Sequence, residues 1–312
     1  TKGGSSGSPV IDITGDAVAL NAGARNKSSS AYFLPLHRVV RALEAVKRCC
    51  PKDGPGGRWR DPKLPRGDLQ TTFAFKGYDE ARRLGLRRET ERAAREASEE
   101  GVGMLVVDTV VPKGPADGVL EAGDVLVRIN GTLTSHFVQM EEILDDKVGK
   151  KVSVEVERGG KPMKCDLRVG DLDSITPGTC VEFAGGVVHA LSYQQARNYR
   201  MEVGLVYVAE PGYVLGHGNI PRHAVVVSVN KAPTPDLASF AAALRGVKHA
   251  DRIPVEYVLF SDRFRAKQAL VTVDYKWYGP PSYLACDNTT GLWNQKPVPL
   301  DKDVLDSIPA TR

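Results

Sequence analysis

The sequence predicts a mainly β protein with a minority of helices (α+β), built as several modules along one chain. Short alternating apolar runs are separated by Gly, Asn and Asp, which is the pattern of strands joined by tight turns. A stretch rich in Pro and Gly, residues 49–67, interrupts these runs and indicates a boundary between modules. After it one pattern occurs twice. A chain of 312 residues is long enough for two or three such domains.

Composition excludes several classes of protein. The 42% hydrophobic and 26% charged residues are ordinary for a globular chain, and a net charge of +4 is too small to indicate nucleic acid as a partner. No apolar run approaches the roughly 20 residues that span a bilayer, so we expect no transmembrane segment. The five scattered cysteines favour a reducing, intracellular compartment over a disulfide framework. His217 and His223 lack partner ligands at metal spacing, so we expect neither a metal nor a cofactor.

The first nine residues contain the clearest candidate for a reactive side chain. Gly4-Ser5-Ser6-Gly7-Ser8-Pro9 precedes two alternating apolar runs, 10–13 and 17–20, joined by a turn at residues 14–16. This pattern indicates a tight turn that carries a small nucleophile and leads into a β-hairpin. A flexible Gly/Ser linker is the alternative. A phosphate-binding loop is disfavoured, because neither Gly-Lys-Ser/Thr nor a helical pattern follows.

The turn resembles Gly-x-Ser-Gly-x-Pro of trypsin-like serine peptidases, and the HtrA/Deg family in particular. In that family a strand, a turn and a second strand precede a Phe-x-x-Pro segment that opens the closing helix, and here Ala31-Tyr32-Phe33-Leu34-Pro35-Leu36 precedes a helical pattern over residues 39–46. The resemblance implies that Ser6 is the nucleophile and that the N–H groups of Gly4 and Ser6 form the oxyanion hole. It also makes Asn21-Ala22-Gly23 a substrate-binding wall. The family usually has Asn where this chain has Ser5.

A serine hydroxyl needs a positioned base, and in these peptidases His and Asp lie far before the serine. We therefore predict that the chain is part of a longer protein, with residues 1–48 the C-terminal end of a trypsin-like β-barrel, and that it is inactive alone. Residues 49–67 are predicted to be a linker.

A second domain is predicted over residues 68–170. Val111–Ala116 and Leu120–Gly131 resemble a PDZ domain, with a short helix after Gly114 and a tight turn at 130–131. A helix capped by Ser135 and a hairpin over 151–169 follow. The resemblance implies strand addition of a peptide beside the strand 105–111, whose preceding loop would hold the terminal carboxylate. The residues expected at this site are Gly103, Met104 and Leu105 in the loop, and Phe137, Met140 and Leu144 on the helix. The three helix residues fit a core position equally well.

The same pattern returns over residues 171–275. Gly103-Met104-Leu105 recurs as Gly204-Leu205-Val206, and about 14 extra residues of the first copy fall in an Arg/Glu-rich stretch, 86–100, predicted to be a solvated helix. The second copy is degenerate, with His223-Ala224 where the first has Gly-Asp. Residues 276–312 are predicted to be a linker or the start of a second protease-like domain.

Two functions follow as expectations. The first, from the HtrA/Deg resemblance, is a serine endopeptidase of protein quality control whose PDZ domains recruit or regulate substrates. Its partners would be unfolded or damaged proteins and peptide C-termini, with a homotrimer possible. Relatives of this long type are nuclear or cytoplasmic in fungi and reside in the chloroplast in plants. The second is a non-catalytic PDZ scaffold that binds peptides and carries a dead protease remnant.

Overall fold

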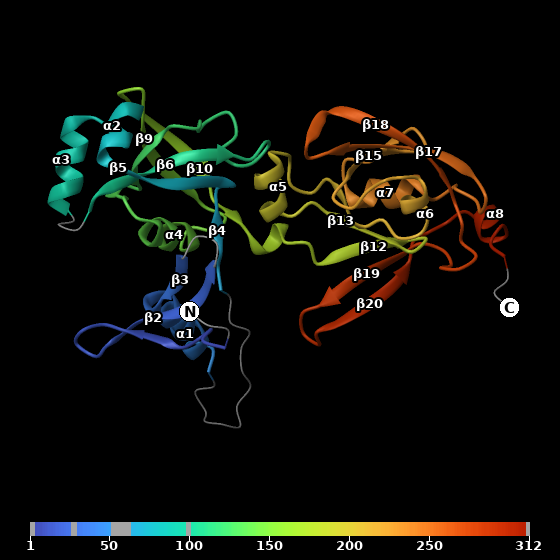
Figure 1. The fold of residues 1–312 in the computed structure, drawn as a ribbon, viewed down its shortest axis with the longest axis horizontal. Coiled ribbons are helices and arrows are strands. Elements are labelled where there is room, and N and C mark those ends of the chain that lie inside the picture. Colours follow the sequence, from blue (N-terminus) through green and yellow to red (C-terminus); the bar gives the residue numbers. More distant parts are fainter. Residues whose placement is uncertain (1–3, 26–29, 51–63, 98–100, 310–312) are drawn as a thin grey trace. The chain divides into compact units, whose positions relative to one another are not determined.

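The structure is a computed structural model that describes residues 4–25, 30–50, 64–97 and 101–309. The chain divides into two units, Thr1–Pro65 and Arg66–Arg312, which we treat separately (Figure 1). Most of the predicted linker, residues 51–63, lies outside the described residues. The architecture is mainly β with a minority of helices, as predicted.

The first unit is a three-stranded antiparallel sheet followed by one helix. Its elements are β1 (Pro9–Ile11), β2 (Ala17–Arg25), β3 (Ser30–Pro35) and α1 (Leu36–Lys47). The predicted hairpin is confirmed, with Pro9 opposite Leu20. Its turn is held by Asp12, whose Oδ1 accepts the backbone N–H groups of Thr14 at 2.9 Å and Asp16 at 3.0 Å. An acidic side chain that takes its own turn's N–H groups is a typical Asx turn.

The second unit begins with one repeat of the predicted pattern, whose strands lie in the order β10-β9-β7-β6-β5 (Figure 1). The elements are β4 (Gly67–Asp68), β5 (Thr71–Gly77), α2 (Tyr78–Leu84), α3 (Arg88–Ala97), β6 (Gly103–Val110), β7 (Val125–Ile129), β8 (Thr132–Leu133), α4 (Phe137–Asp145), β9 (Lys151–Arg158), β10 (Lys161–Arg168) and β11 (Gly170–Asp171). Alternate residues of β6 face opposite sides. Leu105 and Val107 join the core that contains Leu144 of α4, whereas Met104 and Val106 pack with Tyr78 of α2.

Three details of the first repeat differ from the prediction. Helix α3 is not simply solvated, because Thr90, Glu91 and Ala94 are buried against the domain. The N-cap of α4 is His136, without a side-chain cap, rather than Ser135. The segment after Gly114 forms consecutive turns instead of a helix, although Ala116 inside it is buried as expected.

The second repeat contributes to a larger sheet, in the order β18-β17-β15-β14-β13-β12-β19-β20. Its elements are β12 (Thr179–Phe183), β13 (Gly186–Ala190), α5 (Tyr193–Tyr199), β14 (Val206–Glu210), α6 (Val214–His217), β15 (Val225–Val229), β16 (Ala232–Pro233), α7 (Leu237–Ala243), β17 (Arg252–Leu259), β18 (Asp262–Thr272), β19 (Ser282–Asp287), β20 (Leu292–Pro297) and α8 (Lys302–Leu305). A short 3₁₀ turn, Asp173–Ile175, precedes them.

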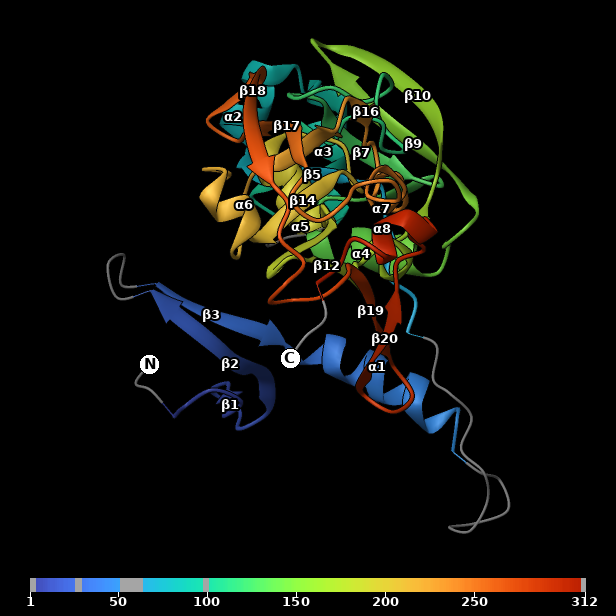
Figure 2. The ribbon, with the colours of Figure 1, turned by 90° about the vertical axis from the view of Figure 1, so that its right-hand side faces the viewer.

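The described part of the tail after residue 275 forms regular structure and is not an extended linker. Strands β19 and β20 extend the sheet beside β12, and Figure 2 shows them below α7 and α8. Val298 and Val304 are buried in the core of the second repeat. The ion pair of Asp301 with Arg245, at 2.8 Å, ties the tail to the end of α7. Few residues of this segment are buried, so its sequence shows little hydrophobic periodicity.

Candidate functional site: a serine turn and a strand-edge groove

Ser6 lies on an exposed turn at the start of the first unit. The turn has two glycines in the left-handed region, Gly4 at φ +92° and Gly7 at φ +82°, where side chains with a Cβ are disfavoured. Two backbone hydrogen bonds fix the turn to β2. The N–H of Gly7 donates to the carbonyl of Asn21 at 2.8 Å, and the N–H of Asn21 donates to the carbonyl of Ser8 at 2.9 Å. The hydroxyl of Ser6 is therefore presented by a tethered loop.

The side chain of Asn21 also holds this turn by hydrogen bonds. Its Nδ2 donates to the carbonyl oxygen of Ser5 and to the Ser5 hydroxyl, both at 3.0 Å, and Asn21 is only 6% exposed. Asn21 therefore positions the turn, and its predicted place in a substrate-binding wall stays a prediction. Ala22 is the extra residue of a β-bulge and is exposed, and Gly23 pairs with Tyr32, so these two remain predicted wall residues.

The backbone N–H groups of the turn divide into two sets. Those of Gly7 and Ser8 bond within the protein, the latter to the Ser5 carbonyl at 3.2 Å. Within the described part of the chain, those of Gly4 and Ser6 have no protein acceptor. Two unpaired N–H groups beside an exposed hydroxyl are the donors that an oxyanion hole requires.

In the first repeat, the strand order corrects the predicted peptide site. Strand β6, which contains Gly103, Met104 and Leu105, pairs with β5 on one side and β7 on the other. All three residues are buried. An interior strand has no free edge, so a peptide cannot be added beside it. Within the described residues the two terminal strands of this sheet are β5 and β10, and β5 is the one that pairs with β6.

Helix α4 contacts β5 at its N-terminal end and β4 at its C-terminal end. At one end the ring of Phe75 stacks on His136 with a centroid distance of 6.0 Å. At the other end the N–H of Gly67 donates to Asp145 Oδ1 at 2.7 Å, and a Cβ on Gly67 would lie 2.1 Å from the Leu144 carbonyl oxygen. An edge strand beside a helix is the geometry of peptide capture by strand addition.

The predicted helix residues divide between core and groove. Met140 and Leu144 are 7% and 3% exposed and belong to the core, whereas Phe137 is 38% exposed. Among these three residues, Phe137 is accordingly the one available to a ligand. Phe75 of β5, also 38% exposed, was missed by the sequence analysis. The alternation Phe73-Ala74-Phe75 directly before Gly77 was the available signal.

The turn that enters β5 carries an unusual carboxylate. Gln70 adopts φ +51°, and its backbone N–H donates to Oδ1 of Asp68. Burial raises the pKa of Asp68 to about 6, against the lowering effects of that hydrogen bond and of Arg197 and Arg66. A terminal carboxylate placed at this end of β5 would meet Asp68, which is ionised at neutral pH.

Comparison with known proteins agrees with this organisation. Residues 83–169 match the family described as PDZ domain, and residues 174–250 match the family described as PDZ-like domain. Both repeats are therefore PDZ domains. Over 310 residues the chain is 50% identical to Protease Do-like 7 of Arabidopsis thaliana and 39% identical to Pro-apoptotic serine protease nma111 of Aspergillus clavatus, covering 99% of this chain in each case. The chain is thus similar in sequence to these two proteases over nearly its whole length.

The homologous region is a fraction of each relative, because the chain spans 28% of the length of both. Among solved structures, an HtrA-type protease AlgW with decapeptide matches 52% of this chain and 44% of its own, with 20% identity and a TM-score of 0.33. Among the described residues, no helix combines the length and apolar character needed to cross a membrane.

Proposed function

We propose that the full-length protein is a serine endopeptidase of HtrA/Deg type in which Ser6 is the nucleophile. The observation that carries the proposal is the turn itself. Its hydroxyl is exposed, two of its N–H groups are unpaired within the described residues, and Asn21 clamps it to the sheet. Homology to proteins named as serine proteases supports the same reading.

In this proposal Ser6 Oγ attacks the carbonyl carbon of the scissile peptide bond while a histidine, held by an aspartate, takes its proton. Both residues would come from chain preceding Thr1. The N–H groups of Gly4 and Ser6 stabilise the resulting oxyanion. The histidine returns the proton to the leaving amine, and water then hydrolyses the ester formed on Ser6. This chain's contribution is the nucleophile, the oxyanion donors and the positioning of both.

The substrates proposed are unfolded or damaged proteins, captured in extended form. Strand addition at β5 of the first PDZ domain would recruit them, with Phe75 and Phe137 contacting ligand side chains. Peptide C-termini are a narrower class of proposed ligand. A homotrimer and an intracellular location, in the nucleus, cytoplasm or chloroplast, belong to the same proposal.

The direct test is turnover by the full-length protein. We expect it to degrade reduced, carboxymethylated α-lactalbumin, a permanently unfolded protein, and the Ser6→Ala variant to lose at least 1,000-fold of that rate. The matched control is Ser8→Ala on the same turn, which we expect to retain activity within about tenfold. Equal rates for wild type and Ser6→Ala would refute the nucleophile.

A second function, a peptide-binding scaffold, is favoured by one separate observation: the β5 edge does not depend on Ser6. If the full-length protein binds the unfolded probe and never cleaves it, the scaffold is the correct function and the serine turn is a structural remnant.

A further inference from the structure

The two PDZ domains differ at the strand that receives a peptide. Strand β14 of the second domain corresponds to β6 of the first by sequence and by position, since each lies between two antiparallel neighbours. Its partner β13 therefore corresponds to the open edge β5, and α7 corresponds to α4. In the second domain, however, the edge of β13 is not open.

Strand β12 covers that edge completely. It pairs antiparallel with β13, with Cys180 opposite His189 and Phe183 opposite Gly186. In the first domain a loop precedes β5. In the second, a two-residue turn with both residues in the left-handed region, Ala184 at φ +48° and Gly185 at φ +82°, joins β12 directly to β13. Such a turn is typical of a tight β-hairpin. The added strand is thus covalently continuous with the strand it pairs with.

The side chains of β12 fill the space between β13 and α7, which are its neighbours in Figure 1. Phe183 is 1% exposed, and its ring meets the rings of Phe240 on α7 and of Tyr275 edge-on, each at a centroid distance of 6.3 Å. Val181 is fully buried in the same core. These are the positions that apolar side chains of a bound peptide would occupy.

The far side of β12 is also engaged, so the strand is held on both edges. Val181 pairs with Tyr283 of β19, and Cys286 of β19 donates its backbone N–H to the Gly178 carbonyl at 2.9 Å. The hairpin turn is packed closely, since a Cβ on Gly185 would lie 2.8 Å from the Tyr278 ring. A peptide could enter only by breaking two sets of strand pairing and exposing Phe183.

We propose that β12 is an intramolecular ligand that permanently occupies the groove of the second PDZ domain. The second domain then captures no peptide by strand addition, and this task falls to β5 of the first domain.

Hydrogen exchange on the full-length Ser6→Ala protein tests the proposal without requiring a ligand. We expect the amides of residues 179–183 to exchange at least 1,000-fold more slowly than an unstructured chain. Phe183→Ala should accelerate them at least tenfold. Phe264→Ala, which truncates a 90% exposed phenylalanine on β18 of the same sheet, should leave them unchanged. Rapid amide exchange of β12 in the protein that retains Phe183 would overturn the proposal. An exchange rate of β12 that Phe183→Ala leaves unchanged would overturn it as well.

A disulfide lock supplies the complementary test. His189→Cys places a thiol opposite the natural Cys180, and oxidation would fasten β12 to β13. We expect oxidised and reduced forms to bind reduced, carboxymethylated α-lactalbumin equally, within twofold, because β12 never leaves the groove; equal absence of binding would agree as well. The control Cys180→Ala/His189→Cys cannot be locked. If locking weakened binding more than tenfold relative to that control, the groove must open to bind, and the proposal would be wrong.

Discussion

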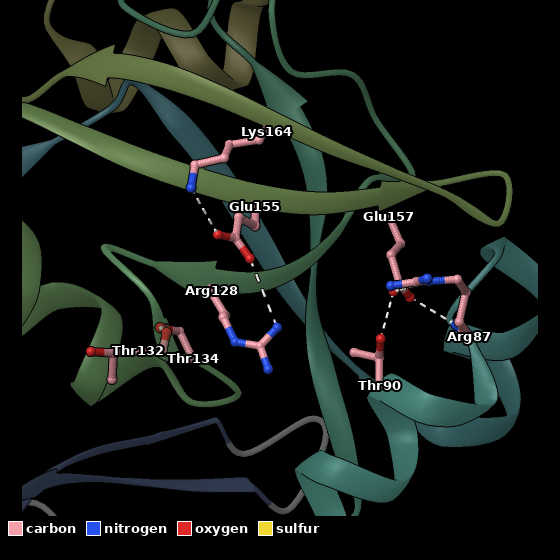
Figure 3. Close-up of polar contacts among 8 residues, drawn as sticks. All are labelled: Arg87, Thr90, Arg128, Thr132, Thr134, Glu155, Glu157 and Lys164. Atoms are coloured by element: carbon pink, nitrogen blue, oxygen red, sulfur yellow. Dashed lines mark hydrogen bonds and ion pairs between the residues drawn. The ribbon is translucent and has the colours of Figure 1, made fainter.

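The buried carboxylate of Glu157 should be worth far more to the first PDZ domain than Glu155, two residues away on the same strand. Glu157 is 1% exposed and accepts three hydrogen bonds: from the backbone N–H of Arg87 at 2.8 Å, from Arg87 Nε at 2.6 Å and from Thr90 Oγ1 at 2.5 Å (Figure 3). Arg87 and Thr90 lie just before and within α3. This carboxylate therefore anchors the helix that the sequence suggested was solvated.

The magnitude follows from burial. Breaking a buried, hydrogen-bonded ion pair typically costs about 3–5 kcal/mol. The Arg87 side chain is 42% exposed and can turn to water, and Gln retains one acceptor oxygen, so we expect about 2–3 kcal/mol for Glu157→Gln. Glu155 is 29% exposed and contacts Arg128 at 3.8 Å and Lys164 at 3.3 Å (Figure 3). Its replacement by Gln should cost less than about 1 kcal/mol.

Local hydrogen exchange is the suitable assay, because a chain of several domains does not unfold in one step. Opening of α3 should become about 30- to 150-fold more frequent in Glu157→Gln, at about 1.4 kcal/mol per factor of ten. In Glu155→Gln the change should stay below about fivefold. Equal effects of the two substitutions, or an unaltered α3 in Glu157→Gln, would refute the anchoring role.

Three further predictions concern the turns beside the two sites. Asp68→Asn should stabilise the protein by up to about 3 kcal/mol at pH 7.5 and by almost nothing at about pH 3, because a carboxyl with a folded pKa of about 6 and an unfolded pKa of 3.8 destabilises the fold increasingly as the pH rises from 3.8 to about 6. A gain in the urea midpoint that is independent of pH would contradict this. Asn21→Ala should slow fluorophosphonate labelling of Ser6 in the full-length protein about tenfold, whereas Ala22→Ser should not slow it. Equal labelling rates in the two variants would show that Asn21 does not position Ser6. Gly67→Ala should make the C-terminal end of α4 more sensitive to proteolysis, because the added Cβ would collide with the backbone of Leu144. The control is Gly118→Ala, where the added Cβ meets no atom but the backbone has a φ of +72° that disfavours a side chain. Equal proteolysis of the two variants would count against the collision.

Local structure was predictable where the residues within one short stretch determine its conformation. The hairpin after Pro9, the helix Leu36–Lys47 and the hairpin of β9 and β10 all follow from alternation or helical spacing bounded by turn residues. The turn around Ser6 was predictable in the same way, whereas the role of Ser6 as nucleophile comes from the family resemblance and stays a prediction. The repeat was visible because two copies of one pattern share a chain.

Strand neighbours were not predictable, because they depend on contacts between residues far apart. Gly103–Leu105 reads as a loop and strand edge, yet it pairs with β5 and is buried in an interior strand, and β5 is the terminal strand beside it. Glu157 reads as a solvated charge until its partner, 70 residues away, is placed beside it. The filled groove of the second domain escaped notice for the same reason, since β12 resembles any short strand.

The measurement that tests the account most directly is the site of covalent labelling in the full-length protein. Treatment with a fluorophosphonate followed by peptide mass spectrometry should place a single adduct on Ser6, with no adduct on the neighbouring Ser5 or Ser8, and none at all in Ser6→Ala. Labelling that persists in that variant, or an intact protein that proteolyses unfolded substrate while Ser6 stays unmodified, would contradict the assignment of the nucleophile.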